Sequence, residues 1–344
     1  MDKGLKKRKD MIYMARALAL MSGGLDSVLA AKIIADQGIE VTGLCFKSAF
    51  FGSKNAEKMA AQIGIPLKVV DFTDEHLAMT KKPKHGYGKN MNPCIDCHAM
   101  MLNYAGKIME EEGYDFLVTG EVLNQRPMSQ NYKSLEIVKE ESGYEDKILR
   151  PLSALNLPPT QMELSGMVDR SKLLGFNGKT RKPQMALAEK LGIVEYPSPA
   201  GGCSLTEPNF AARLKDLYEH DKENADAHDV RLLRVGRHFR LTDKAKAIST
   251  RNEEEYKVLR ELITDDMLIF DTAEYSGSTV VLKTSKGHKA SKDEIELAAA
   301  IAARYSKARD EESVLVKYKK QKDSEYEFVR VKPADDGELK NMML

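Results

Sequence analysis

The stretch Ser22-Gly23-Gly24-Leu25-Asp26-Ser27 follows an apolar run, residues 17–21, and precedes residues 28–34, which are apolar at helical spacing. A strand that turns through Ser-Gly-Gly into a helix exposes backbone N–H groups at the helix N-terminus, where phosphate oxygens bind. The two glycines let the backbone approach a phosphate closely. The two serines add hydroxyl donors, and Asp26 is a hard oxygen ligand suited to Mg²⁺. The stretch therefore predicts a phosphate site between a strand and a helix.

Two simpler patterns explain this stretch less well. It is not the Walker pattern, because no Gly-Lys-Ser/Thr follows the glycines. A Gly-Gly turn with a Ser or Asp helix cap would explain a bare Ser-Gly-Gly, but six consecutive matching residues favour a phosphate loop. The hexapeptide resembles the PP-loop of ATP pyrophosphatases, which split ATP into AMP and pyrophosphate. The resemblance implies that ATP is used, and leaves its acceptor open.

Length and composition limit the remaining possibilities. At 344 residues the chain is long enough for two cores, so we expect two domains. The net charge is +1 at pH 7, so no global field attracts nucleic acid and any RNA contact must come from local patches. Four cysteines without the regular spacing of a secreted framework indicate a reducing cytosol and a metal or catalytic use.

The N-terminal segment resembles part of a signal peptide. Lys6-Lys7-Arg8-Lys9 precedes the largely apolar residues 11–21, but Arg16 interrupts this run and cleavage behind it would destroy the phosphate loop. No apolar run reaches the length that a membrane span needs. We therefore expect a cytoplasmic protein without a membrane partner, and a disordered tail over residues 1–10.

Short apolar runs alternate with helical segments after this tail. We expect strands at 17–21, 41–46, 67–71 and 116–120, and helices at 26–37, 54–63, 97–112 and 184–191. Such alternation predicts an α/β fold with a doubly wound parallel sheet. Ligands of these folds bind at the carboxyl ends of the strands, where the phosphate loop, Cys45-Phe46-Lys47 and Gly120-Glu121 would lie.

The domain boundaries follow from changes in pattern. Residues 11–205 are expected to form the PP-loop ATP pyrophosphatase and sulfur-transfer domain. The charged stretch 206–228 reads as a helical linker. Residues 229–344 contain alternating strand-like segments and an Ala-rich helix, which predicts a small α+β domain with a possible role in RNA binding.

Three of the four cysteines are candidates for chemistry. Cys94 and Cys97 lie in Asn92-Pro93-Cys94-Ile95-Asp96-Cys97-His98, ahead of a helical run, and a helix N-terminus favours the thiolate form. Zinc, a redox disulfide and an iron–sulfur cluster all use Cys-x-x-Cys. For zinc, His98 or His85 could add a ligand. The cluster hypothesis adds Cys203, because three thiolates on a 4Fe-4S cluster leave one iron open for sulfur. Cys45, within an apolar strand pattern, reads as a core residue.

Together these motifs resemble those of the tRNA thiolation enzymes. The shared features are the PP-loop, Asn-Pro-Cys-x-x-Cys, Val118-Thr119-Gly120 at a strand end, and the distant Cys203. Within that group the chain is similar to the 4-thiouridine synthetases and the 2-thiouridylases, and above all to a stand-alone ThiI-like group. That likeness rests on Gly120-Glu121-Val122-Leu123-Asn124-Gln125-Arg126-Pro127-Met128-Ser129-Gln130 and Arg150-Pro151-Leu152-Ser153. It covers about residues 11–208, whereas the C-terminal part resembles the NFACT-R module, mainly over residues 235–240.

The resemblance implies a tRNA sulfurtransferase that adenylates a uridine carbonyl oxygen and replaces it with sulfur, giving 4-thiouridine, with ATP, Mg²⁺ and a 4Fe-4S cluster as cofactors. The residues it assigns to ATP and Mg²⁺ are Ser22, Gly23, Gly24, Asp26, Ser27, Phe46, Lys47 and Gly120. Cys97 and Cys203 match the sulfur-handling positions of the thiouridylases, and Cys94 resembles the cluster-bearing form. The partners would be tRNA and either sulfide or a sulfur-donor protein, and a homodimer is left open.

RNA contacts would rest on local polar and basic groups, namely Gln125, Arg126, Arg150, Lys179, Arg181, Lys182, Arg237 and Arg240. On an alternating segment such residues are equally typical of a solvated sheet face. Three other functions remain open: sulfur insertion into a small molecule, 2-thiouridine formation through a persulfide on Cys97 and Cys203, and a non-catalytic, ATP-gated RNA-binding protein with a structural metal.

Overall fold

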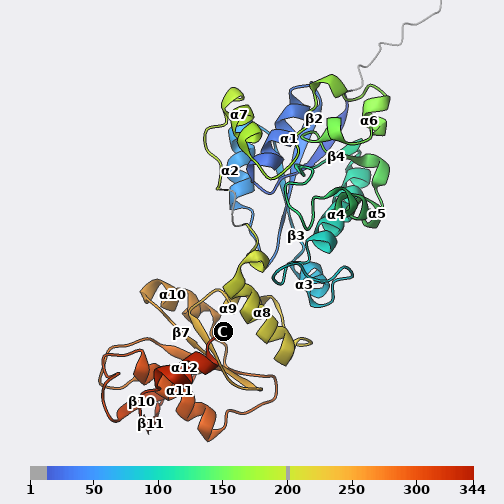
Figure 1. The fold of residues 1–344 in the computed structure, drawn as a ribbon. Coiled ribbons are helices and arrows are strands. Elements are labelled where there is room, and N and C mark those ends of the chain that lie inside the picture. The colour runs from blue at the N-terminus through green and yellow to red at the C-terminus, as the bar shows by residue number, and fades with distance from the viewer. Residues whose placement is uncertain (1–13, 199–201) are drawn as a thin grey trace, which may run out of the picture. The chain divides into compact units, whose positions relative to one another are not determined.

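The computed structural model describes residues 14–198 and 202–344 of the chain (Figure 1). Contacts divide the chain into two compact units. Unit 1 contains the chain up to Phe72 together with Lys82–Gly88 and Pro93–Gly202. Unit 2 contains Thr73–Lys81, Lys89–Asn92 and Cys203–Leu344. Each unit has its own sheet and its own hydrophobic core.

Unit 1 is built on a five-stranded sheet in the order β3-β2-β1-β4-β5, and each pairing in it is parallel. The strands are β1 (Arg16–Leu20), β2 (Glu40–Lys47), β3 (Leu67–Asp71), β4 (Phe116–Val118) and β5 (Ile148–Leu149). The order reverses between β1 and β4, because the chain first adds β2 and β3 on one side and later β4 and β5 on the other. Open parallel sheets bind ligands at this switch point, outside the carboxyl ends of the strands.

Helices cover both faces of this sheet, which confirms the expected doubly wound α/β fold (Figure 1). Side chains of β1 alternate: Ala17 and Ala19 pack in one cluster, and Leu18 in the other. The first cluster includes side chains of α1 (Leu25–Ala35), α2 (Lys54–Ile63) and α7 (Lys182–Lys190). The second includes α4 (Cys94–Glu112) and α5 (Tyr132–Ser142). Unit 1 also contains α6 (Gln161–Leu164) and short 3₁₀ turns at Glu145–Lys147, Ala154–Asn156 and Arg170–Lys172.

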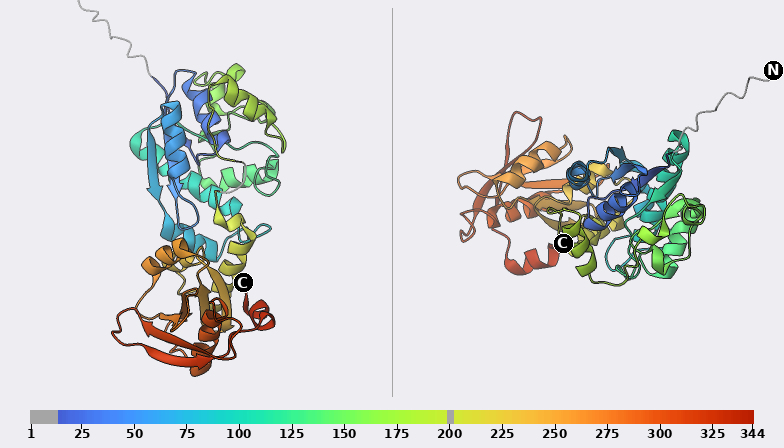
Figure 2. Two further views of the ribbon diagram at one scale, coloured as in Figure 1. Left: turned by 90° about the vertical axis from the view of Figure 1, so that its left-hand side faces the viewer. Right: turned by 90° about the horizontal axis from the view of Figure 1, so that it is seen from above.

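Unit 2 is built on a six-stranded antiparallel sheet in the order β11-β10-β8-β9-β7-β6. Its strands are β6 (Arg237–Thr242), β7 (Ala245–Ser249), β8 (Leu268–Thr272), β9 (Val280–Thr284), β10 (Val314–Lys320) and β11 (Glu327–Val331). The Ala-rich helix α11 (Lys292–Arg304) packs across one face of the sheet. Small side chains allow it to lie close to the strands, and the separate α+β domain expected here is confirmed. Figure 2 shows this sheet in orange and red in two further views.

The stretch predicted as a linker, residues 206–228, instead belongs to unit 2. It begins with the last residue of the 3₁₀ turn Ser204–Thr206 and contains all of α8 (Pro208–Asp221) and the start of α9 (Ala227–Leu232). Helix α3 (Thr73–Lys81), from the middle of the unit 1 sequence, joins them: the hydroxyl groups of Thr80 and Tyr218 are 2.8 Å apart. Unit 2 is completed by α10 (Glu253–Leu262) and α12 (Asp336–Met342). The predicted tail at residues 1–10 lies outside the described residues.

The observed helices differ in length from the predicted ones mainly at their N-termini. Helix α4 begins at Cys94, three residues before the predicted start, so both cysteines of the pair lie in its first turn. Among the described residues, no helix is both long and apolar enough to cross a bilayer.

Candidate active site

The phosphate loop connects the end of β1 to the start of α1 at the switch point of the sheet. Gly23 has φ +78° and lies so close to α2 that a Cβ there would be 2.3 Å from the Ala56 nitrogen. The loop is braced from within, since the Ser27 hydroxyl donates to the Gly24 carbonyl at 2.8 Å and the Gly24 N–H donates to Ser22 Oγ at 3.3 Å. Gly23 therefore meets a steric requirement, and the loop leads into the N-terminus of α1, where backbone N–H groups suit an anion.

Asp26, in the first turn of α1, is held by two glutamines far away in sequence. Gln125 Nε2 donates to Asp26 Oδ2 at 2.7 Å, and Gln184 Nε2 donates to Gln125 Oε1 at 2.7 Å. The other carboxylate oxygen of Asp26, Oδ1, is buried and has no hydrogen-bond partner among the described residues. One oriented and one unoccupied carboxylate oxygen beside a phosphate cradle fit a Mg²⁺–ATP complex. Gln125 therefore positions Asp26. The sequence pattern predicted an RNA contact for Gln125 and did not predict this role.

The end of β2 contributes less than the sequence suggested. Phe46 is buried, with its ring centroid 5.0 Å from that of Phe72 and 6.4 Å from that of Tyr104. Its side chain is thus part of the core, and the expected position of this residue near the adenosine stays a prediction. Lys47 remains exposed at the strand end and forms an ion pair with Asp71 at 3.3 Å.

The end of β4 packs directly against the phosphate loop. A Cβ on Gly120 would lie 2.4 Å from the Ser27 nitrogen and 2.6 Å from the Asp26 carbonyl carbon. Only a residue without a side chain allows the two backbones to be this close. Gly120 therefore sets the spacing between the phosphate loop and the next residue along the chain, Glu121.

Glu121 is the centre of a buried hydrogen-bond network. His98 donates to Glu121 Oε1 through Nδ1 at 2.9 Å, whereas Arg150 Nε and the Thr119 hydroxyl donate to Oε2 at 2.9 and 3.1 Å. Burial alone would raise the pKa of Glu121, but the charge of Arg150 and the hydrogen bond from His98 lower this pKa to about 2. The carboxylate therefore stays ionised and orients the His98 ring. The sequence predicted that Glu121 lies at the carboxyl edge of the sheet. It did not predict the partners His98 and Arg150, which are 23 and 29 residues away along the chain.

The cysteine pair lies beside this network. Cys97 is buried, Cys94 is half-buried, and the Cys97 N–H donates to the Pro93 carbonyl at 2.9 Å. Because His98 contacts Glu121, this first turn of α4 is fixed at the carboxyl end of β4. Two thiols in one helical turn form a donor set that suits a soft metal or an iron–sulfur cluster.

The other two cysteines have different surroundings. Cys203 is half-buried and precedes the 3₁₀ turn Ser204–Thr206 of unit 2, so a joint site with the pair in unit 1 stays a prediction. Cys45 is buried in β2, as expected. Burial, with a smaller effect of Glu57, raises the pKa of its thiol to about 11, which makes it unreactive at neutral pH.

The predicted RNA-binding residues fall into two groups. Arg126, Lys179 and Lys182 are exposed and Arg181 is half-buried, so these four remain candidates. Arg150 is only 5% exposed and is bound to Glu121 and the Leu135 carbonyl, which contradicts an RNA contact.

The two candidates on β6 already have partners. Arg240 donates to both carboxylate oxygens of Asp216, at 2.8 and 2.6 Å, and Arg237 lies 4.8 Å from the ring centroid of Tyr305. An arginine whose donors already bind a buried carboxylate is a poor phosphate ligand. Arg240 therefore has a structural role, whereas an RNA contact by Arg237 stays a prediction.

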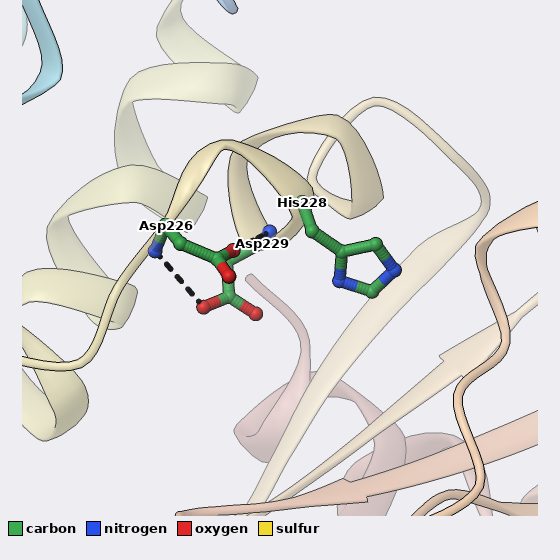
Figure 3. Close-up of side chains that lie close together, drawn as sticks. All are labelled: Asp226, His228 and Asp229. Carbon is green, nitrogen blue, oxygen red and sulfur yellow. Dashed lines mark hydrogen bonds between the residues drawn. The ribbon is translucent and has the colours of Figure 1, made fainter. Parts of the chain in front are cut away.

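A carboxylate and histidine cluster in unit 2 has the composition of a metal site, but local contacts explain it (Figure 3). Asp226 and Asp229 form the capping box of α9, in which each side chain accepts from the other's backbone N–H. Lys283 Nζ lies 2.5 Å from Asp229 Oδ1, and the His228 ring bonds the Leu262 carbonyl at 2.7 Å. We therefore interpret this cluster as a helix cap with an ion pair.

Two family models match the chain. The model described as thiamine biosynthesis protein (ThiI) matches residues 13–157, and that described as NFACT protein RNA binding domain matches residues 236–343. The tRNA sulfurtransferase of Desulfurococcus amylolyticus is 27% identical over 274 residues, covering 76% of this chain and 50% of that protein. The tRNA-specific 2-thiouridylase MnmA of Marinobacter nauticus is 25% identical, covering 65% of this chain and 58% of that protein.

A probable tRNA sulfurtransferase of Thermoanaerobacter sp. is 34% identical over 152 residues, covering 41% of this chain and 37% of that protein. The chain thus spans about half the length of the curated relatives it matches. A solved 4-thiouridine synthetase–RNA complex with bound ATP has a TM-score of 0.39 at 18% identity, covering 64% of this chain and 52% of that one. The chain therefore contains a region similar to the ThiI family at residues 13–157 and a region similar to the NFACT RNA-binding domains at residues 236–343.

Proposed function

We propose that this chain is an ATP-dependent tRNA thiolation enzyme that replaces a uridine carbonyl oxygen with sulfur. The proposed product is 4-thiouridine. One observation carries the proposal: unbroken contacts run from the phosphate loop to the cysteine pair. Gly120 packs on Ser27, the next residue Glu121 accepts a hydrogen bond from His98, and His98 adjoins Cys97. An ATP site and a sulfur site that share one strand end fit a reaction that uses both on the same substrate atom.

The chemistry requires activation because a uracil carbonyl oxygen is a poor leaving group. In the proposed first step this oxygen attacks the α-phosphorus of ATP, a new P–O bond forms, and pyrophosphate leaves with the electrons of the broken P–O bond. N–H groups of the loop would stabilise the pyrophosphate charge, and Asp26 Oδ1 would hold Mg²⁺. In the second step a sulfur nucleophile adds to the activated carbon, and AMP leaves with the C–O bonding electrons.

For the sulfur step we propose that Cys94, Cys97 and Cys203 hold a 4Fe-4S cluster. When bound, such a cluster supplies an iron without a protein ligand at which sulfide can be presented to the activated carbon. The chain's own part is positional, because Glu121 fixes the His98 ring and thereby the turn that carries the cysteine pair. The alternative is a persulfide, supplied by a sulfur-donor protein, on one of Cys97 and Cys203. Its outer sulfur attacks the activated carbon and AMP leaves; the thiolate of the other cysteine then breaks the S–S bond, which releases the thiolated base and leaves a Cys97–Cys203 disulfide, so no third thiol is needed.

Iron content and pyrophosphate release together test the proposal. We would purify the protein without oxygen and measure iron, sulfide and visible absorbance for the wild type and for Cys94→Ala, Cys97→Ala and Cys203→Ala. Cys45→Ala is the matched control, because this thiol is buried in β2. We expect a brown wild type and control, and loss of iron in the three other variants.

The second measurement is pyrophosphate release with ATP, Mg²⁺ and sulfide, with and without tRNA. Release that depends on tRNA, together with thiolated nucleoside in the digested RNA, supports the proposed reaction. A colourless protein after anaerobic reconstitution would refute the cluster and favour the persulfide route. If tRNA does not change pyrophosphate release but a small acceptor molecule increases it, the proposal that tRNA is the substrate is wrong. If no pyrophosphate is released under any condition, the chain is a non-catalytic binding protein.

A further inference from the structure

One part of the unit 2 sheet is left uncovered. Helix α11 packs against all six strands on one face. On the other face, a second apolar cluster joins residues of α9 and α10 to Ile248 on β7 and Val281 on β9, with Ile269 on β8 at its margin. The same face continues over β10 and β11, whose side chains there are not part of this cluster.

The side chains on this continuation are basic and aromatic. Lys317 and Lys319 of β10 lie with their ammonium groups 5.1 and 4.6 Å from the ring centroid of Tyr326. Phe328 of β11 is directly across from Lys317 and is 58% exposed. Arg330, across from Leu315, is exposed as well. We call these five residues, Lys317, Lys319, Tyr326, Phe328 and Arg330, the β10–β11 face.

Strand alternation separates these residues from nearby acids. Tyr318, between the two lysines, points to the α11 side, where its ring stacks on Phe270 and its hydroxyl donates to Glu327 at 2.8 Å. Glu327 is therefore turned away from the β10–β11 face. Asp271 of β8 does lie across from Lys317, and one of its oxygens accepts a hydrogen bond from Thr279 at 2.7 Å. Three cations, Lys317, Lys319 and Arg330, thus share this face with one carboxylate, Asp271. The Lys319 ammonium also donates to the Asp323 carbonyl at 3.0 Å, which leaves two of its three N–H donors for a phosphate.

The exposed Phe328 ring and the flanking cations give this surface both an aromatic face and positive charge. Unpaired nucleic acid matches it, because bases stack on aromatic rings and phosphates pair with the flanking cations. A duplex does not match, because its bases are stacked on one another and are not available. A strand of RNA therefore complements both the charge and the ring surface of this hairpin.

We propose that the β10–β11 face binds unpaired RNA nucleotides, with a base stacked on Phe328 and phosphates held by Lys317, Lys319 and Arg330. The inference rests on the proposed function for RNA as the partner, and it adds where and in which form RNA is bound. It also replaces the predicted contact at Arg240, whose guanidinium group binds Asp216.

The test is RNA binding by the full chain, measured by fluorescence anisotropy on an unpaired oligonucleotide and on a duplex of the same sequence. We expect the unpaired RNA to bind more tightly, and Phe328→Ala to weaken this binding by about 5-fold to 150-fold. Phe328→Trp should restore it. Lys317→Gln/Lys319→Gln should make the slope of log affinity against log salt less steep by about 1.4, at roughly 0.7 per lost phosphate contact.

Matched controls lie elsewhere in the same unit. Lys292→Gln/Lys307→Gln removes two exposed lysines, one at the start of α11 and one three residues after its end, and Tyr256→Ala removes a partly exposed ring of α10. Both should bind as the wild type does. Circular dichroism and thermal denaturation check that each variant is folded, which we expect because none of the substituted side chains is buried.

The possible outcomes separate this inference from the proposed function. If the wild type binds RNA and Phe328→Ala binds it equally well, the β10–β11 face is not the contact and RNA recognition lies elsewhere. If the wild type binds no RNA, the proposed tRNA substrate fails with it. If Phe328→Ala changes the oligomeric state in light scattering and leaves RNA binding intact, the edge strand β11 pairs with a second copy instead, and the inference is wrong.

Discussion

Replacing Gly120 by alanine would test how closely the end of β4 must approach the phosphate loop. The added Cβ would lie 2.4 Å from the Ser27 nitrogen and 2.5 Å from the Ser27 Cα, whereas ordinary contacts begin at 3.4 Å. The backbones must therefore separate by about 1 Å, the difference between 3.4 and 2.4 Å. Both contacting groups are backbone atoms in the first turn of α1, so no side chain can move aside to absorb the change.

This displacement should affect catalysis more than folding. Overpacking of this kind costs about 1–3 kcal/mol in the free energy of unfolding. A shift of about 1 Å at the loop that holds the phosphates should lower pyrophosphate release by about 100-fold. We would measure ATP affinity by calorimetry, pyrophosphate release in the presence of tRNA, and the unfolding free energy by denaturant titration.

Gly52→Ala is the matched control, because a Cβ at Gly52 would meet no atom within 4 Å and its backbone conformation suits any residue. It should leave affinity, turnover and stability close to those of the wild type. Gly120→Ala protein that binds ATP and releases pyrophosphate at wild-type levels would refute the reasoning, since the loop would then tolerate the separation. Lost stability with unchanged turnover would mean that the contact serves packing alone.

Three further predictions concern the buried polar groups. Folding holds the pKa of Glu121 at about 2 against its ordinary value of 4.5, so it stabilises the protein above pH 4.5 and this contribution is lost as the pH falls toward 2. In denaturant titrations at a series of pH values, the unfolding free energy of Glu121→Gln should therefore fall by about 3 kcal/mol less on acidification than that of the wild type. Arg150→Met should lower the unfolding free energy by about 3–5 kcal/mol, because the buried Glu121 carboxylate would lose its cationic partner. It should leave RNA affinity unchanged, because Arg150 is buried, and weaker RNA binding by a folded variant would contradict this. Gln125→Ala and Gln184→Ala should raise the Mg²⁺ concentration for half-maximal pyrophosphate release about 10-fold to 100-fold by releasing Asp26, whereas an unchanged Mg²⁺ requirement would show that its orientation does not depend on them.

Local sequence patterns were enough to predict the α/β architecture of unit 1. Strands β1 and β3 and helix α2 lie within one residue of their expected positions, because apolar periodicity depends on which face of an element is buried. The phosphate loop was equally visible, because a glycine just before a helix start can adopt the positive φ that Gly23 shows. The start of α4 was less visible, because Pro93 and Cys94 do not resemble a standard helix cap.

The sequence alone determined which kinds of chemistry the chain carries: a phosphate loop, a Cys-x-x-Cys pair beside a helix, and a cysteine, Cys45, that belongs to the core. Only the tertiary structure decided which distant residues serve them. Asp26 and Gln125 are 99 residues apart, and His98, Glu121 and Arg150 come from three separate elements. Such partners have no local signature, because their stabilisation comes from removing water around charges that meet only after the strands have paired. The same reason explains why Arg150 and Arg240 look like surface cations in the sequence and prove to be buried or half-buried ion-pair partners in the fold.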